Sequence, residues 1–197
     1  MPFIYLAGPQ VFRPDALAQG AHLKAVCAQS GLTGLYPLDG AASEGENAHT
    51  IRARCIDLLD AADAVVADIS PFRGPHMDPG TAWEIGYAQA RGLKVHLWSR
   101  DPRHLRARIP ASLTAHGWRD KAGDLVEDFG QPENLMICAP DAPVHPNPET
   151  AIAVAAESLV HPPSIRAQTG RGLVFMIGLA MMAALLASLT ARRLMGW

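Results

Sequence analysis

The chain alternates short apolar segments with longer segments whose apolar residues recur at helical spacing. This alternation is typical of a parallel sheet covered by helices. The strands that we predict are Phe3–Ala7, Gly34–Pro37, Ala64–Asp68, Lys94–Trp98 and Leu135–Cys138. The helices that we predict are Pro14–Gln29, Thr50–Ala62, Thr81–Arg91 and Pro148–Leu159. The fold class is therefore α/β, with a doubly wound parallel sheet.

Composition excludes several classes of function. With 197 residues and 49% hydrophobic content, the chain is long enough for one domain with a sizeable core. A formal charge of -2 argues against binding to nucleic acid. The cysteines Cys27, Cys55 and Cys138 lie far apart and form no C-x-x-C pair, so we expect reduced thiols in a cytoplasmic protein. The histidines lack metal-ligand spacing, and we predict no metal.

The C-terminal part has a different character. From Leu173 to Leu189, 17 consecutive residues carry no charge, and arginines flank them on both sides. We predict a catalytic domain over residues 1–160, a linker over 161–171 and an apolar helix over 172–191. This length is at the short end of the range for crossing a bilayer. The helix is therefore either a transmembrane anchor for the cytoplasmic domain or a buried helix in a subunit interface.

In an open parallel sheet, ligands bind beyond the carboxyl ends of the strands, where the strand order reverses. The loops that follow the first three predicted strands are Gly8–Arg13, Leu38–His49 and Ile69–Gly80. Gly8 allows a ligand to come close to the backbone. Phe12 is a candidate for stacking on a base, whereas core packing is favoured for Trp83. Neither G-x-G-x-x-G nor G-x-x-x-x-G-K-[ST] occurs, which argues against a dinucleotide or P-loop site.

Residues 77–88, MDPGTAWEIGYA, hold two carboxylates, Asp78 and Glu84, around the predicted start of a helix. One interpretation is structural: either Thr81 and Glu84 form a capping box, or Asp78 is the N-cap and Pro79 takes the first helical position. A catalytic interpretation places Glu84 in the first helical turn, where the partial positive charge stabilises a carboxylate nucleophile. Two carboxylates in different environments are suited to cleaving a glycosidic bond through an oxocarbenium-like transition state.

Three motifs, in this order along the chain, resemble those of the nucleoside 2-deoxyribosyltransferase family. They are IYLAGPQVF near the N-terminus, MDPGTAWEIGYA in the middle and FGQPENLMI beyond residue 128. The resemblance covers roughly residues 3 to 160 and leaves out the apolar tail. It implies a flavodoxin-like α/β domain that assembles into a homo-oligomer and needs no cofactor.

The resemblance also implies roles for individual residues. Glu84 would be the nucleophile that takes the deoxyribosyl group at C1′, and Asp78 would bind the nucleobase and handle its proton. Tyr5 would hydrogen-bond to the glutamate, although a tyrosine in a strand is also ordinary core. Asp57 would help to hold the sugar, whereas helical periodicity alone makes it a solvated acid. In the third motif, Asn134 and Met136 would reach the sugar bound by the adjacent protomer.

The expected function is exchange of nucleobases on 2′-deoxynucleosides through a covalent intermediate on Glu84. Its partners are a 2′-deoxynucleoside and a free nucleobase. One alternative is an N-glycoside hydrolase that uses the same site on nucleosides or nucleotides. The other alternative is a membrane-tethered, non-catalytic nucleotide-binding module.

Overall fold

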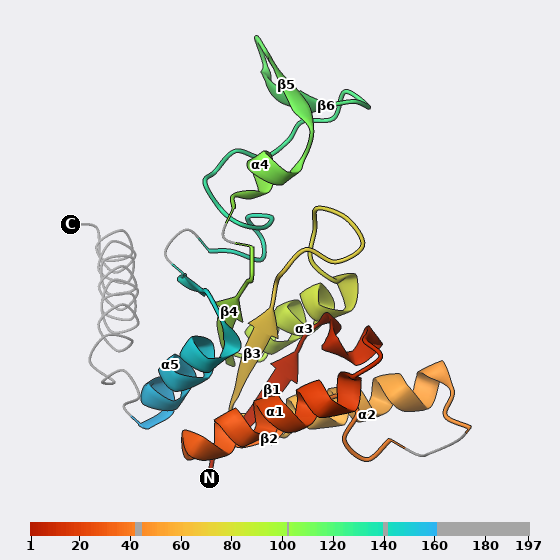
Figure 1. Cartoon of the computed structure of the whole chain (residues 1–197), viewed down its shortest axis with the longest axis vertical. Coiled ribbons are helices and arrows are strands. Elements are labelled where there is room, and N and C mark those ends of the chain that lie inside the picture. Colours follow the sequence, from red (N-terminus) through yellow and green to blue (C-terminus); the bar gives the residue numbers. More distant parts are fainter. Residues whose placement is uncertain (42–44, 102, 140–141, 161–197) are drawn as a thin grey trace, which may run out of the picture. The chain divides into compact units, whose positions relative to one another are not determined.

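A five-stranded parallel sheet lies at the centre of the fold in the computed structural model (Figure 1). Its strands are β1 (Phe3–Ala7), β2 (Thr33–Leu35), β3 (Ala64–Asp68), β4 (Lys94–Trp98) and β7 (Val144–His145). They lie in the order β2-β1-β3-β4-β7, which is the strand order of a flavodoxin-like doubly wound sheet. All residues of β3 are buried, because helices cover both faces of the sheet, and this explains its continuous apolar run.

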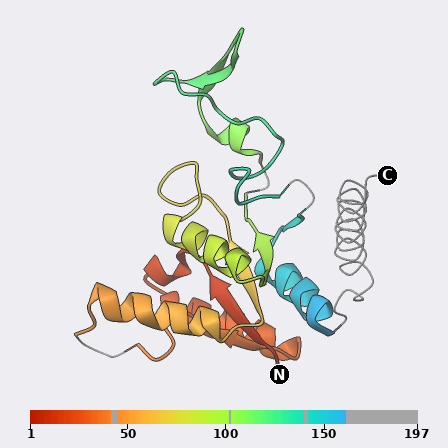
Figure 2. The ribbon, with the colours of Figure 1, turned by 180° about the vertical axis from the view of Figure 1, so that it is seen from behind.

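Helices cover the two faces of the sheet in pairs (Figures 1 and 2). They are α1 (Ala16–Gln29), α2 (Ala48–Asp60), α3 (Pro79–Ala90) and α5 (Pro148–Val160). The core between the sheet and the pair α1 and α5 includes Ile4, Leu6, Leu23, Ile152 and Ala155. The core between the sheet and the pair α2 and α3 includes Tyr5, Val65, Leu59, Ile85 and Ala88. Successive residues of β1 thus enter opposite cores, as the pleat of a strand requires.

Most predicted elements are present, but the strand expected at Leu135–Cys138 is wrong. Those residues form turns, in which the Asn134 side chain accepts a hydrogen bond from the Met136 amide at 2.9 Å and the Asn134 carbonyl accepts from the Cys138 amide at 3.0 Å. An asparagine that satisfies the next amides locally competes with strand pairing. The fifth strand of the sheet is β7, further along the chain.

Between β4 and β7 the chain makes an excursion that we did not predict. It contains the short helix α4 (Leu105–Arg108) and an antiparallel hairpin of β5 (Ala111–Thr114) and β6 (Gly117–Asp120). The hairpin extends away from the central sheet (Figure 1). Its strands are only four residues long, and their side chains are exposed or half-buried. Short strands without a buried face lack the alternating apolar pattern on which a prediction depends.

The structure describes residues 1–41, 45–101, 103–139 and 142–160. The predicted linker over 161–171 and the predicted apolar helix over 172–191 lie outside these residues. Among the residues that are described, no helix is both long enough and apolar enough to cross a membrane.

Candidate active site

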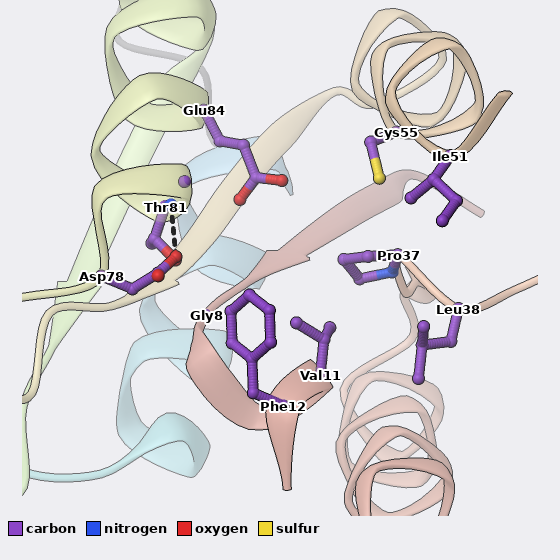
Figure 3. Close-up of a pocket in the computed structure, with 11 residues that line it drawn as sticks. Gly8, Val11, Phe12, Pro37, Leu38, Ile51, Cys55, Asp78, Thr81 and Glu84 are labelled. Atoms are coloured by element: carbon purple, nitrogen blue, oxygen red, sulfur yellow. Dashed lines mark hydrogen bonds between the residues drawn. The ribbon is translucent and has the colours of Figure 1, made fainter. Parts of the chain in front are cut away.

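A cavity of about 320 Å³ lies beyond the carboxyl ends of β1 and β2, against the start of α3 (Figure 3). This is the edge at which the strand order reverses, because the chain continues from β1 to β2 on one side and then crosses to β3 on the other. The residues that line the cavity are Gly8, Val11, Phe12, Pro37, Leu38, Ile51, Cys55, Asp78, Gly80, Thr81 and Glu84. The two carboxylates singled out in the sequence therefore share one cavity.

Asp78 caps the helix that carries Glu84. Its Oδ2 accepts hydrogen bonds from the Thr81 amide at 2.8 Å and from the Thr81 hydroxyl at 3.0 Å, and Pro79 occupies the first helical position. The second of the two capping interpretations is thus confirmed. Because the helix begins at Pro79, Glu84 lies in the second helical turn. We had expected it in the first turn, so that expectation was wrong.

Glu84 is paired with the buried side chain of Tyr5. The Tyr5 hydroxyl donates a hydrogen bond of 2.5 Å to Oε1 of Glu84. Burial raises the pKa of Glu84 to about 7; the hydrogen bond from Tyr5 opposes this rise and the charge of Asp78 adds to it. The helix terminus does not dominate, since its field falls off within the first turn. Near neutral pH, Glu84 therefore exists both as the acid and as the carboxylate.

Tyr5 is at once a core residue of β1 and a member of the site. Its side chain is fully buried, and burial, together with the negative charge of Glu84, holds the pKa of its hydroxyl far above the usual value. Tyr5 therefore remains protonated and acts as a hydrogen-bond donor. Both interpretations from the sequence, a core residue and a hydrogen-bond donor to Glu84, therefore hold for Tyr5.

Neighbouring side chains of the protein itself leave no room for a side chain at Gly8. A Cβ at Gly8 would lie 2.1 Å from Oε1 of Gln10 and 2.9 Å from Cβ of Asp68. Asp68 is buried and accepts hydrogen bonds from Gln10 Nε2 at 2.5 Å and from the Ser70 amide at 2.8 Å. This network joins the loops after β1 and β3 beneath the cavity.

The two aromatic residues considered for base stacking, Phe12 and Trp83, lie in different environments. Phe12 lines the cavity, is 56% exposed and stacks on Phe72 with a centroid separation of 5.4 Å. It thus remains available to a planar ligand. The prediction that Trp83 packs in the core is wrong, because Trp83 is 44% exposed and stacks on Tyr87 on the outer side of α3.

The structure does not bring Asp57 to the cavity. Asp57 is an exposed residue of α2, whereas Ile51 and Cys55, one helical turn apart on the same helix, line the cavity. The sequence analysis did not select Cys55 as a site residue. The sequence feature that could have identified Cys55 is the apolar stripe along this helix, which contains Ile51 and Cys55 but not Asp57.

Asn134 and Met136 also lie outside the cavity of their own chain. The Asn134 side-chain amide donates to Glu127, and the Met136 side chain is 75% exposed. A residue that we missed, Glu133, anchors this segment: it is buried and accepts hydrogen bonds from the Met77 amide and from His76, both at 2.8 Å. Glu133 thus joins the segment to the loop that ends in Asp78.

No group of three or more His, Cys, Asp or Glu side chains is arranged to hold a metal ion within the part of the chain that the structure describes. The three cysteines are free. The cavity offers carboxylates, a tyrosine hydroxyl behind one of them and apolar walls. These groups are suited to acid–base and nucleophilic chemistry on a small ligand with an apolar ring.

Comparisons with known proteins agree with this geometry. The family model described as nucleoside 2-deoxyribosyltransferase matches residues 4–136. An uncharacterised protein of Schizosaccharomyces pombe is 35% identical over 127 residues, and the match covers 61% of this chain but only 60% of that protein. The solved structure of a 2-desoxiribosyltransferase from Leishmania mexicana is 37% identical with a TM-score of 0.69, and the match covers 80% of this chain and 98% of that one.

Proposed function

The chain belongs to the nucleoside 2-deoxyribosyltransferase family, and on that premise we propose that it exchanges nucleobases on 2′-deoxynucleosides through a covalent deoxyribosyl–glutamate intermediate. The observation that carries this proposal is the hydrogen bond from the buried Tyr5 to Glu84, which lines the same cavity as Asp78. The solved 2-desoxiribosyltransferase of Leishmania mexicana supports the same class of reaction. The enzyme is then a pentosyl transferase.

In the first half-reaction, the Glu84 carboxylate attacks C1′ of the deoxynucleoside. The bond from C1′ to the base nitrogen breaks and its electron pair leaves with the base. Asp78, in the form that carries a proton, delivers this proton to the departing base and becomes a carboxylate. Both hydrogen bonds from Thr81 go to Oδ2 of Asp78, so we assign Oδ1 to the nucleobase. The product is an ester between the sugar and Glu84.

In the second half-reaction, another nucleobase attacks C1′ of this ester. Asp78 takes the proton that the incoming base loses, and Glu84 leaves as a carboxylate. Tyr5 stabilises that carboxylate in both directions, because burial and the charge of Glu84 keep its hydroxyl protonated. Phe12, half-exposed at the edge of the cavity, provides a surface on which the base stacks.

We also propose that a neighbouring protomer completes the site with Asn134 and Met136. These residues do not line the cavity of their own chain, and Met136 is largely exposed. The neighbouring side chains Phe129 and Leu135 are 66% and 45% exposed. An exposed apolar segment anchored by a buried glutamate is suited to contact a second copy of the chain.

The experiment for the proposed function incubates the full chain with deoxyinosine and free adenine and separates the products by chromatography. We expect deoxyadenosine and hypoxanthine from the parent and from Glu157→Gln, which alters an exposed acid on α5. We expect no deoxyadenosine from Glu84→Gln. Free deoxyribose without deoxyadenosine would instead establish a hydrolase. Binding of deoxyinosine without any product would establish the non-catalytic module.

A further inference from the structure

We propose that Glu133 is a positioning residue that holds two parts of the catalytic machinery in one arrangement. These parts are Asp78, the acid of its own site, and the segment around Asn134, which is offered to the neighbouring site. The inference rests on the proposed function, because it assigns to Glu133 the placement of groups that act in base exchange. Glu133 does not line the cavity, so it acts through the residues that it holds.

Both carboxylate oxygens of Glu133 hold the chain immediately before Asp78. Oε1 accepts a hydrogen bond from Nδ1 of His76, and Oε2 accepts one from the amide of Met77, each at 2.8 Å. Met77 is the residue before Asp78, so this contact fixes the backbone that enters the site. From the other direction, the amide and the hydroxyl of Thr81 fix Oδ2 of Asp78. Glu133 therefore supplies the hold on the N-terminal side of the acid.

The loop before Asp78 needs an anchor of this kind because its tip is exposed. Arg73 and Gly74 lie at the tip and are exposed. The amide of Phe72 donates a hydrogen bond of 2.8 Å to the carbonyl of His76, which closes the turn. That hydrogen bond fixes the shape of the turn but not its position against the sheet. A contact outside the loop and next to Asp78 fixes that position, and Glu133 makes one.

The same carboxylate fixes the segment that follows it in the chain. Oε1 of Glu133 also accepts a hydrogen bond from the amide of Asn134 at 3.0 Å. Oδ1 of Asn134 in turn accepts from the amide of Met136 at 2.9 Å. Asn134 and Met136 are the residues that we assign to the neighbouring site. Because one side chain binds both stretches of backbone, a displacement of Glu133 moves Asp78 in one site and Asn134 in the next.

The surroundings of Glu133 make its side chain rigid. Its side chain is 2% exposed, and the equally buried side chain of Arg108, from α4, places Nη2 3.6 Å from Oε2. A carboxylate removed from water is stable where opposite charge and hydrogen bonds replace the solvent. Glu133 has an arginine beside it and N–H donors from His76, Met77 and Asn134. A change of rotamer would break several of these contacts at once.

The test follows single turnovers of the first half-reaction. Each enzyme is mixed in excess with deoxyinosine, and the release of hypoxanthine is measured by quenching and chromatography. At saturating enzyme, the rate constant reports the chemical step and does not depend on the folded fraction. We expect Glu133→Gln, which keeps only one acceptor oxygen, to lower this rate constant by about ten- to hundredfold through a misplaced Asp78. It should also weaken the binding of deoxyinosine, because Asn134 moves as well.

Variants of His76 provide a milder test that leaves the buried pair of Glu133 and Arg108 intact. The His76 side chain is 56% exposed, so His76→Ala does not open the core. We expect it to lower the rate constant by about two- to tenfold, the range of one hydrogen bond, without weakening binding. His76→Asn places an amide donor near the position of Nδ1 and should restore the parental value. His22→Ala, in the exposed pair with Glu149, should leave the rate constant unchanged.

The outcomes separate the two proposals. If the parent exchanges bases and Glu84→Gln does not, the proposed function stands. The inference is then overturned by a parental rate constant in folded Glu133→Gln or in His76→Ala, and equally if His76→Asn is as slow as His76→Ala. A slow Glu133→Gln with parental binding of deoxyinosine overturns the link to Asn134. If the parent exchanges no bases, both proposals fail together. Circular dichroism establishes folding, and the His76 variants suffice if Glu133→Gln is not folded.

Discussion

The hydroxyl of Tyr5 lies 2.5 Å from Oε1 of Glu84, although the two residues are 79 positions apart in the chain. One is in the middle of a central strand and the other is in the second turn of a helix that packs on that strand. The donor and the carboxylate are thus held by two rigid elements. This arrangement preorganises the nucleophile before any substrate binds.

Replacing Tyr5 by phenylalanine removes the one interaction that lowers the pKa of Glu84. We expect the lower limb of the pH profile of kcat/KM to move to higher pH, and the rate at pH 6 to fall by about tenfold or more, as expected for a hydrogen bond to a charged group. Steady-state kinetics between pH 5 and 9 measures both effects. A parental pH profile in Tyr5→Phe would show that Tyr5 does not tune Glu84.

Glu84 also contributes to the dependence of stability on pH. Its pKa in the folded protein is about 7, above its ordinary value of 4.5, so the folded state binds the proton more tightly than the unfolded state. Its contribution is fully favourable below pH 4.5 and is lost as the pH rises through 7. We expect Glu84→Gln, which resembles the protonated acid, to stabilise the protein at pH 8 by about 1–3 kcal/mol and to change little at pH 5.

Urea unfolding at the two pH values measures this difference. Glu157→Gln serves as the control, since this exposed acid on α5 has no such environment. Equal stabilisation of Glu84→Gln at pH 5 and pH 8 would mean that the proton on Glu84 is not the cause.

Two glycines provide a matched test of packing beneath the cavity. Gly8→Ala places a Cβ against Gln10 and Asp68, and we expect it to reduce the free energy of unfolding by about 1–3 kcal/mol. Gly86→Ala places a Cβ on α3 with no atom within 4 Å, and we expect a gain of about 0.5–1 kcal/mol from helix propensity. Urea unfolding of both variants checks the pair. Tolerance of Gly8→Ala would show that the Gln10 side chain moves aside.

The three cysteines should differ in reactivity. Cys27 and Cys138 are fully buried, and burial raises the pKa of each thiol to about 11, whereas Cys55 is reached through the cavity. We expect a small methanethiosulfonate to modify one thiol in the folded protein and three after unfolding, as measured by intact mass. Deoxyinosine should slow the first reaction. A single adduct that persists in Cys55→Ser would place the reactive thiol elsewhere.

A mixing experiment tests whether Asn134 acts in a neighbouring protomer. Glu84→Gln and Asn134→Ala are each expected to have little exchange activity as homo-oligomers. After their subunits are exchanged, a mixed oligomer contains sites with both native residues only if Asn134 is supplied in trans. We therefore expect activity to return on mixing, as measured by formation of deoxyadenosine. No return of activity in verified mixed oligomers would place Asn134 in its own chain's site.

The sequence alone located four of the five strands of the sheet and its main helices. β1, β3 and β4 have the bounds that the sequence predicted. β1 and β3 are buried almost throughout, and strands buried on both faces show a local apolar pattern that needs no knowledge of their neighbours. The N-cap at Asp78 was also foreseen, since capping involves residues three positions apart. Leu135–Cys138 looked like a strand because it is a short apolar run. In the structure Leu135 and Met136 are exposed and Cys138 is buried, and hydrogen bonds to Asn134 and Glu133 hold the segment in turns.

Tertiary structure decided the chemistry of the cavity. It brought Cys55 to the wall and left Asp57 outside, because the packing of α2 on the sheet sets which face of that helix the cavity meets. It also set the pKa of Glu84, which depends on burial between β1 and α3 and on a hydrogen bond from the far end of the sequence. Helical and strand periodicity report only on neighbouring residues. The charge state of a buried carboxylate depends on everything that surrounds it in space.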